Sequence, residues 1–399
     1  MTFRHFLLLL LASISWSTLE AATNHKKKSY EIELRHPGIN SNKPKIHTLY
    51  QIQDAHGLII GYSMVVDSVI CKEATCEVVN VTMTWDALGQ YQSYKLDEGI
   101  ELEKVKIPKK KKTIESKVNS YAAIPFSSAD NKKLDQILKE KHSPLKTRTL
   151  ENVTNVHKEN EDIDFVASPT PPTIKNAVIE GAALTCFHLW HWANGDVVKA
   201  TKELTHQSCS EKQLSHLVAS EKPHYVLFAL EHLIQHKLYS LKIVKLVNDQ
   251  MQNEAQQSII DLGYLYLNNA IPSKEQFQDN LATIFSQSNN HSRILLLQLL
   301  EAKKELPDAL IEKMITSLPL MKDYDEINAF LNMLEKLNYA SPAVLTNSAK
   351  VLENNNFFIA RRAYWYLEEK SLDKQNSDLV LKFREKSLKE DRNLKRIGQ

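Results

Sequence analysis

Between residues 164 and 173 the chain reads Asp164-Phe-Val-Ala-Ser-Pro-Thr170-Pro-Pro-Thr173, and the pattern of the sequence changes there. Before this stretch, short runs of β-branched and apolar residues are separated by turn residues, which is typical of strands. After it, apolar residues recur at helical spacing almost to the end of the 399-residue chain. The sequence therefore predicts an α+β fold, with an antiparallel-sheet domain followed by an all-α domain.

Strand-like runs occupy the region from Ile46 to about Lys106, with a further strand in the preceding segment at Tyr30–Leu34. The clearest runs are Leu49–Ile52, Leu58–Tyr62, Met64–Ile70 and Val78–Met83. Successive strands joined by tight turns pair antiparallel. This region therefore predicts an antiparallel sheet.

Cys71 and Cys76 end one predicted strand and begin the next across a hairpin-length loop. Cysteines that flank such a loop can meet the geometry of a disulfide. A zinc site would need two more ligands, and no such ligands cluster nearby in the sequence. We therefore predict a Cys71–Cys76 disulfide. Cys186 and Cys209 lie in helical sequence, where buried free thiols and a second disulfide both remain open.

Beyond Gly195 the sequence predicts pairs of helices. The first helix of each pair begins near Pro223, Glu254, Ser292, Asp323 and Phe357, and the second near Ser240, Ser273, Asp308, Ala343 and Ser377. The spacing within either series is about 31 to 38 residues, the period of a two-helix solenoid unit. Residues 196–399 therefore predict a HEAT- or armadillo-like solenoid that binds a protein partner, with a plain helical bundle as the structural alternative.

The N-terminus predicts export. Residues 1–22 place a basic residue before an apolar run and end in small residues, as a secretory signal peptide does. The expected location is periplasmic or extracellular, and residues 23–47 read as a polar lead-in. The net charge of +2 predicts no nucleic-acid partner. No later segment reaches the roughly 18 apolar residues of a transmembrane helix.

Residues 48–195 resemble the FMN-binding domain of extracytoplasmic flavin proteins. That family carries the signature Asp-x-Val-Ser-Gly-Ala-Thr before a helix. Here Asp164, Val166 and Thr170 match the signature, while Ala167, Ser168 and Pro169 replace its Ser, Gly and Ala. The run from Tyr50 to Tyr62 matches the family in style. The resemblance implies an antiparallel-sheet flavin domain.

The resemblance also implies a cofactor and its site. In many members the final Thr of the signature is esterified by FMN phosphate, which would be Thr170 here, with Thr173 as the second candidate hydroxyl. A helix N-terminus carries a partial positive charge that attracts phosphate. The implied cofactor-binding residues are Asp164, Ser168, Thr170 and Thr173. Because some members are subunits of membrane electron-transfer complexes, association with such a complex is also implied.

The same residues admit a structural interpretation. Ser168 replaces a Gly that lets the backbone approach phosphate, and the prolines at 169, 171 and 172 lack N–H donors. Ser168, Thr170 and Thr173 would then only cap a long helix predicted from Ile174 to Asn194.

Two functions follow. The chain is either an electron-transfer flavoprotein that docks a partner, or a scaffold that has lost its flavin site. No Gly-x-Ser-x-Gly, His-Glu-x-x-His or Walker motif favours hydrolase chemistry. His188 and His191 are three residues apart on the predicted helix, and their aromatic neighbours Trp190 and Trp192 favour packing between the sheet and the solenoid over a metal site.

Overall fold

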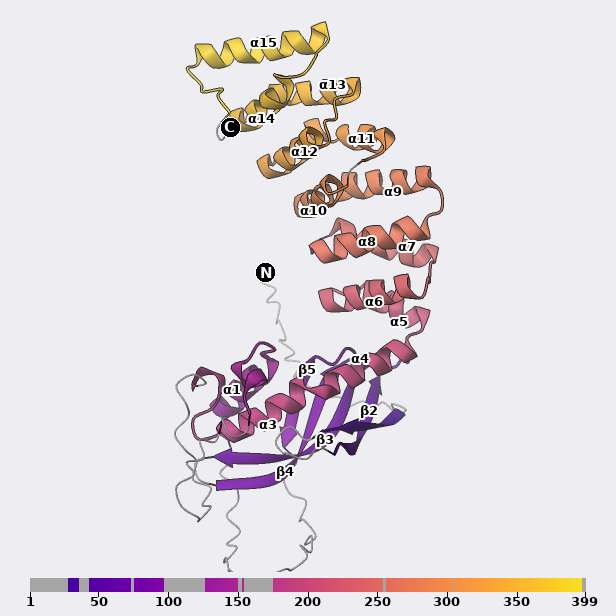
Figure 1. Cartoon of the computed structure of the whole chain (residues 1–399), viewed down its shortest axis with the longest axis vertical. Coiled ribbons are helices and arrows are strands. Elements are labelled where there is room, and N and C mark those ends of the chain that lie inside the picture. The colour runs from indigo at the N-terminus through magenta and orange to yellow at the C-terminus, as the bar shows by residue number, and fades with distance from the viewer. Residues whose placement is uncertain are drawn as a thin grey trace, which may run out of the picture. The chain divides into compact units, whose positions relative to one another are not determined.

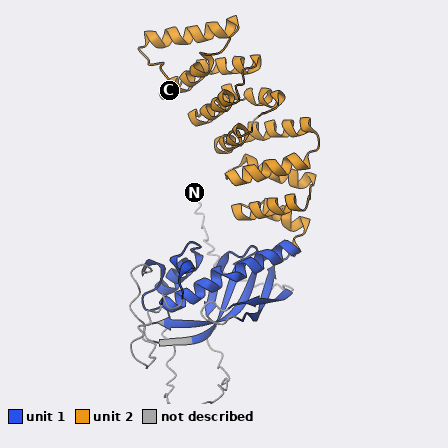
Figure 2. Cartoon of the chain, in the orientation of Figure 1, with its two compact units in different colours: residues 1–207 blue, residues 208–399 orange. Residues whose placement is uncertain are grey.

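The computed structural model describes residues 28–35, 43–72, 75–96, 126–149, 153, 175–253, 256–303 and 305–396. These residues form a five-stranded antiparallel sheet followed by helices, so the α+β class predicted from the sequence is confirmed (Figure 1). The chain divides into two compact units, residues 1–207 and 208–399 (Figure 2). Each unit is described below by itself.

The sheet is a simple meander in which each strand pairs with the next along the chain. Its strands are β1 (Lys28–Leu34), β2 (Lys45–Gln53), β3 (Ile59–Lys72), β4 (Thr75–Asp86) and β5 (Tyr91–Leu96). The pairing of β3 with β2 ends at Met64, and that of β4 with β5 begins at Val81. The β3–β4 hairpin therefore extends beyond both neighbouring strands. β1 also shows that part of the predicted lead-in belongs to the sheet.

One face of the sheet is buried beneath helices. Side chains point alternately to the two faces of a strand, and Leu49, Met64 and Met83 lie opposite one another on the buried face. Next to them, Tyr62 pairs with Trp85, and both are almost fully buried. On the other face Tyr50 and Val65 are exposed. Burial of one face fixes the strand register, because a one-residue slip would reverse it.

Five helical segments follow the sheet among the described residues of the first unit. They are α1 (Ser128–Lys139), α3 (Ala183–Asn194), α4 (Asp196–Ser208) and the short 3-10 turns η1 (Pro144–Thr147) and η2 (Lys175–Ala177). α3 contacts β3, α1 and η1, so it lies between the sheet and the smaller helices (Figure 1). Trp85 donates its indole N–H to the carbonyl of Ala193 at 2.8 Å, and Trp190 donates to the carbonyl of Glu140 at 2.8 Å. These two bonds join α3 to the sheet on one side and to α1 on the other.

The long helix predicted from Ile174 is shorter in the structure. α3 begins at Ala183, after the short turn η2 and a turn at Gly181, whose φ is 73°. A positive φ is available to Gly at little cost and breaks a right-handed helix. The prediction placed Gly181 inside the helix, and that part of it is wrong.

The second unit consists of helices. They are α5 (Glu211–Val218), α6 (Pro223–Gln235), α7 (Leu241–Gln252), α8 (Gln257–Ala270), α9 (Lys274–Gln287), α10 (Asn290–Glu301), α11 (Asp308–Ile315), α12 (Tyr324–Lys336), α13 (Pro342–Lys350), α14 (Phe357–Leu367) and α15 (Lys374–Lys389), with the 3-10 turns η3 (Leu318–Leu320) and η4 (Val351–Glu353). From α6 onward every helix begins within three residues of its predicted start. The eight-residue α5 was not predicted.

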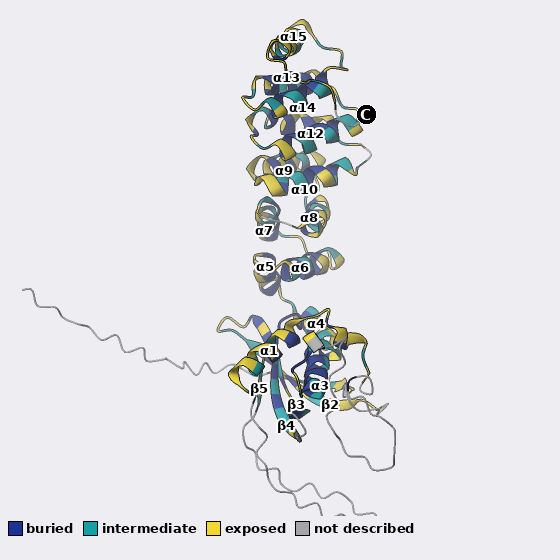
Figure 3. Ribbon diagram, turned by 90° about the vertical axis from the view of Figure 1, so that its left-hand side faces the viewer, coloured by how far each residue is buried: buried dark blue, intermediate teal, exposed yellow. Residues whose placement is uncertain are grey.

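The helices of the second unit contact one another in two rows. One row runs α6, α8, α10, α12, α14, and the other runs α5, α7, α9, α11, α13, α15. N-cap side chains accept a backbone N–H at most of the starts, namely Ser210, Ser240, Ser273, Asn289, Asp323, Ser341, Asn356 and Asp373. Such caps each contribute about 1 kcal/mol. The buried stripes of the two rows face each other (Figure 3).

Glu326 gives the second unit a testable pH dependence. Its side chain is 1% exposed, and its carboxylate lies 2.9 Å from the Arg293 guanidinium. Burial raises the pKa of Glu326 above its ordinary value of 4.5, although Arg293 opposes this. The pKa of Glu326 is higher in the folded protein than in the unfolded chain. Its protonated carboxyl therefore stabilises the fold at low pH, and this contribution is lost as the pH rises from 4.5 through the raised pKa. In chemical unfolding across this pH range, we expect the free energy of unfolding of wild type to fall with rising pH and that of Glu326→Gln not to show this fall. Parallel pH profiles for the two proteins would contradict the prediction.

Candidate functional site

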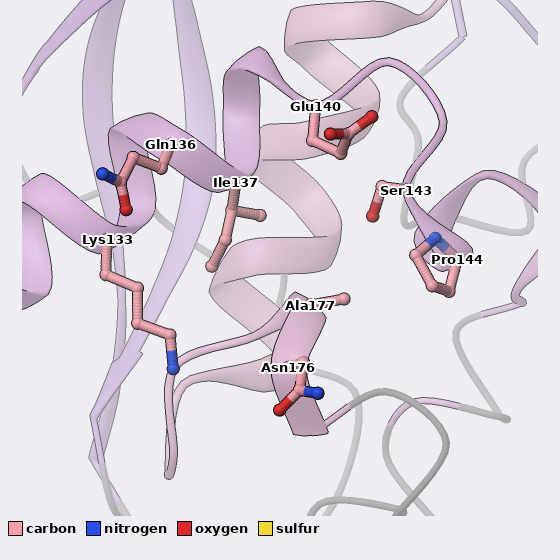
Figure 4. Close-up of a pocket in the computed structure, with 8 residues that line it drawn as sticks. All are labelled: Lys133, Gln136, Ile137, Glu140, Ser143, Pro144, Asn176 and Ala177. Atoms are coloured by element: carbon pink, nitrogen blue, oxygen red, sulfur yellow. The ribbon is translucent and has the colours of Figure 1, made fainter.

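A pocket of about 480 Å³ opens in the first unit, between α1, η1 and η2 (Figure 4). Its lining residues are Lys133, Gln136, Ile137, Glu140, Ser143, Pro144, Asn176 and Ala177. Pockets of this size accept small organic ligands. α1 supplies the first four of these residues, and its start is fixed by a capping box between Ser127 and Asp130.

The pocket lining combines apolar surface with polar groups and side chains of both signs of charge. Figure 4 shows the Lys133 amine extending beside the segment that carries Asn176. The Glu140 carboxylate accepts the backbone N–H of His142 at 2.9 Å, and the Ser143 hydroxyl accepts that of Leu145 at 3.3 Å. These local bonds hold the turn after α1. A lysine ammonium beside neutral amides suits an anionic group such as a phosphate.

The pocket lies where the chain leaves the flavin-like stretch. Asn176 follows Thr173 by three residues in the sequence. The predicted cofactor residues Asp164, Ser168, Thr170 and Thr173 themselves lie outside the described residues. The described lining fits the polar phosphate and ribityl end of FMN. Its only apolar side chains, Ile137, Pro144 and Ala177, make no flat surface for the ring.

The helix terminus implied by the resemblance is not where the sequence analysis placed it. α3 begins nine residues after Ile174, and its N-cap is Ala182, which makes no side-chain capping bond. The residue at the N-cap position of α3 is therefore Ala182 and not Thr173.

The aromatic and histidine side chains of α3 are packed. His188, Trp190 and Trp192 are each 3% exposed or less. His191 contacts the Phe187 ring, with centroids 4.4 Å apart, and hydrogen-bonds the backbone of Leu145; burial lowers its pKa. Trp192 meets the ring of His47 on β2 with centroids 5.2 Å apart. The tryptophans therefore pack within the first unit. The sequence analysis had expected them to pack between the sheet and the helical repeat.

The register of the β3–β4 hairpin places Cys71 directly opposite Cys76. The backbone N–H of Cys71 donates to the Thr185 hydroxyl at 2.6 Å, and that hydroxyl donates to the Cys71 carbonyl at 3.2 Å. Both backbone groups of Cys71 are thus directed away from β4, so the two cysteines form a non-hydrogen-bonded pair. Such pairs bring Cα atoms to about 4.5 Å, within the range of a disulfide. The bond itself stays a prediction, because the Cys76 side chain lies outside the described residues.

Cys186 and Cys209 are free thiols. Burial raises the pKa of Cys186 to about 11 and that of Cys209 to about 12. Since the thiolate is the reactive form, both should be inert at neutral pH. The second disulfide left open by the sequence is therefore not formed in the structure.

Thiol counting tests both statements. We expect the oxidised native protein to react slowly with iodoacetamide at pH 8, because Cys186 is buried, Cys209 is half-buried and both thiols are protonated. In denaturant without reductant two thiols should be alkylated, and all four after reduction, as measured by intact mass. Alkylation of all four without reductant would mean that Cys71 and Cys76 are not bonded. Fast labelling of the native protein would contradict the raised pKa of Cys186 and Cys209.

Comparison with protein-family models, curated proteins and solved structures finds no match. Within the described residues no helix combines the length and apolar character needed to cross a membrane. The sequence analysis did not identify Lys133, Glu140 or Asn176, which line the pocket. Nothing in the sequence distinguishes them from ordinary surface residues, because only the packing of α1 against η2 brings them together.

Proposed function

We propose that this is an exported protein whose residues 208–399 form a HEAT- or armadillo-like helical repeat that docks a protein partner. One observation carries the proposal. Polar side chains connect helices two places apart in the chain at a nearly constant sequence separation. This regularity is what a stack of two-helix units requires, because each unit contacts only its neighbours.

The connections occur in both rows. In one row Arg293 pairs with Glu326, Glu301 with Lys336, and Arg362 with Asn328. In the other, Asn248 and Asn280 exchange amide hydrogen bonds at 2.7 and 3.0 Å, Asp279 pairs with Lys313, and Asn376 bonds Thr346. The pairs named here are 30 to 35 residues apart, and Arg362 bonds Glu335 at a separation of 27. A bundle with one closed core gives no reason for this spacing.

Two further features support a repeat. α6 and α12, three pairs apart, end alike: Lys237 and Asn338 have φ of 53° and 50°, and the N–H of the next residue returns to the carbonyl five residues earlier. α15, the last helix, has an outer surface that is largely exposed and charged (Figure 3). Terminal repeats need such a polar outer face for solubility.

Deletion of one whole unit tests the repeat. Removing residues 290–323 takes out α10, α11 and η3 and places the N-cap Asn289 where Asp323 caps α12. In a repeat the neighbouring units can then stack directly. We expect a soluble monomer with cooperative urea unfolding and an m-value reduced in proportion to the residues removed.

The matched control deletes residues 290–306, which removes α10 alone and leaves α11 to take its place. Because this inverts the alternation of the two rows, we expect aggregation or loss of cooperative unfolding. If both the whole-unit deletion and the single-helix deletion aggregate or lose cooperative unfolding, the result favours a bundle and overturns the repeat.

One edge of the second unit is suited to a partner. Tyr324 and Phe358 occupy the first turns of α12 and α14 and are 36% and 59% exposed. The Arg361 guanidinium lies 5.2 Å from the Phe358 ring centroid, which holds the ring in place. Aromatic and arginine side chains dominate binding energy at protein interfaces. We therefore assign the docking surface to this edge.

A photo-crosslinking amino acid at position 358 tests the docking surface in the producing cell. We expect a discrete adduct with another protein that is lost when Tyr324→Ser is added. A crosslinker at Leu388, which is 62% exposed on α15, provides the control. Equal adducts from both positions, or none from 358, would remove the docking assignment while leaving the repeat intact.

A second candidate, FMN binding by the first unit, is favoured by the pocket at the downstream end of the flavin-like stretch. When bound, FMN supplies one- and two-electron chemistry. Of the described residues, Lys133 would hold the phosphate and Asn176 a ribityl hydroxyl. Co-production with an FMN-transfer enzyme should then give a yellow protein whose mass is increased by one FMN. Thr170→Ala and Thr173→Ala would locate the ester. A colourless protein that also fails to bind added FMN would contradict FMN binding by the first unit.

A further inference from the structure

Helix α6 carries three ring side chains along one stripe. Phe228, His232 and His236 are spaced four residues apart, so they lie one above another on the helix surface. The ring centroids of Phe228 and His232 are 6.2 Å apart and those of His232 and His236 are 4.4 Å apart, with interplanar angles of 37° and 35°. The buried Phe228 therefore lies next to the ring of His232, and the two imidazoles are adjacent and tilted against each other.

The two histidines have the arrangement of a chelating pair. His232 is 6% exposed and His236 is exposed, and a ring nitrogen of each lies within 4.8 Å of the other. Zinc binds imidazole nitrogen at about 2.0–2.1 Å. A small rotation of the exposed His236 ring would let one ion contact both nitrogens. Since His232 is held by packing, only one side chain must be ordered on binding.

The end of α6 adds an electrostatic contribution. His236 is the C-cap residue, and its N–H donates to the His232 carbonyl at 3.0 Å. The last turn of a helix carries about half a negative charge on its carbonyl groups. A cation held by residues 232 and 236 sits in this field. Lys237, which follows in the left-handed conformation, opposes it in part.

We propose that His232 and His236 bind a divalent transition metal of the kind that prefers imidazole, with Zn²⁺ as its representative and water in the open coordination positions. Imidazole ligands favour zinc, copper and nickel over the oxygen-seeking ions Mg²⁺ and Ca²⁺. The two residues lie at the C-terminal end of α6 and at its C-cap, and the site does not depend on the proposed docking function or on FMN.

Isothermal titration of the mature chain, made without a polyhistidine tag, with ZnCl₂ at pH 7.5 tests the site. Loss of an outer partner of a metal ligand already costs about 10- to 100-fold in affinity. We therefore expect His236→Ala to weaken Zn²⁺ binding at least about tenfold. The same loss is expected for His232→Ala, whose folding is checked by circular dichroism. His291→Ala, at an exposed position on α10, is the matched control and should bind as wild type does.

Protons provide a second readout, because an imidazole must be neutral to bind a metal. Lowering the pH from 7.5 should therefore weaken Zn²⁺ binding, and by more for two imidazole ligands than for one. MgCl₂ should give no heat of binding. The proposal is overturned if His236→Ala, which is exposed and safe to replace, binds Zn²⁺ as tightly as wild type. It is also overturned if His291→Ala weakens binding equally.

Discussion

Replacing Arg362 by methionine is expected to lower the free energy of unfolding of the helical unit by about 3 to 5 kcal/mol, the usual cost of breaking a buried ion pair. The Arg362 side chain is 3% exposed. It donates to Asn328 at 2.7 Å, to Asn332 at 2.8 Å, and to both carboxylate oxygens of Glu335 at 3.1 Å. Methionine fills similar space but donates nothing. The two amides and the carboxylate would then lose partners where water reaches them poorly.

The control uses the same carboxylate. Arg396 also bonds Glu335, at 2.9 Å, but its side chain is 33% exposed. Exposed ion pairs contribute about 0 to 1 kcal/mol, so Arg396→Met should shift urea unfolding only slightly. Far-UV circular dichroism follows the helical unit in both variants. If the two substitutions cost the same, the Arg362 network is not a main stabilising contact between α12 and α14.

Trp85→Ala should destabilise the first unit by about 3 to 5 kcal/mol, because removal of a buried tryptophan leaves a large cavity. Trp85 is 1% exposed and lies opposite Tyr62 in the sheet. The substitution also leaves the Ala193 carbonyl without the indole donor at 2.8 Å. That bond is one of the connections between the sheet and α3. The expected phenotype is therefore loss of α3 docking as well as loss of stability.

Two further variants separate these contributions. Trp85→Phe keeps much of the ring volume but not the N–H donor, so it should cost less than alanine and more than a neutral surface change. Tyr50→Ala, on the exposed face of the same sheet, should change stability by less than about 1 kcal/mol. Thermal unfolding monitored by tryptophan fluorescence compares Trp85→Ala, Trp85→Phe and Tyr50→Ala. A cost for Trp85→Ala no larger than that for Tyr50→Ala would contradict the packing described here.

Local patterns predicted much of the secondary structure. Pro223 and Pro342 lie at the first helical position of α6 and α13, and Ser240 and Ser273 cap α7 and α9. These signals act within one turn of the chain, so they can be read without knowing the fold. Alternating apolar residues likewise predicted the strands, because one face of the sheet is buried.

Features that depend on packing could not be predicted. α5 is only eight residues long, too short for its periodicity to stand out. The turn at Gly181, whose φ is 73°, interrupts a stretch in which the sequence pattern predicted a helix. The pocket lining joins α1 to a turn more than 35 residues further along the chain. Neither the lysine nor the asparagine carries a local signature of that contact.

The sequence by itself determined the α+β class, the order of strands before helices, and the positions of helix starts, because these depend on backbone preferences and on apolar periodicity along a few residues. The tertiary structure alone decided which polar groups meet. Arg362 bonds Asn328, Asn332 and Glu335 on another helix, and Lys133 and Asn176 come to line one pocket. A hydrogen bond or a pocket depends on distances between atoms that are remote in the chain, and only the packed fold sets those distances.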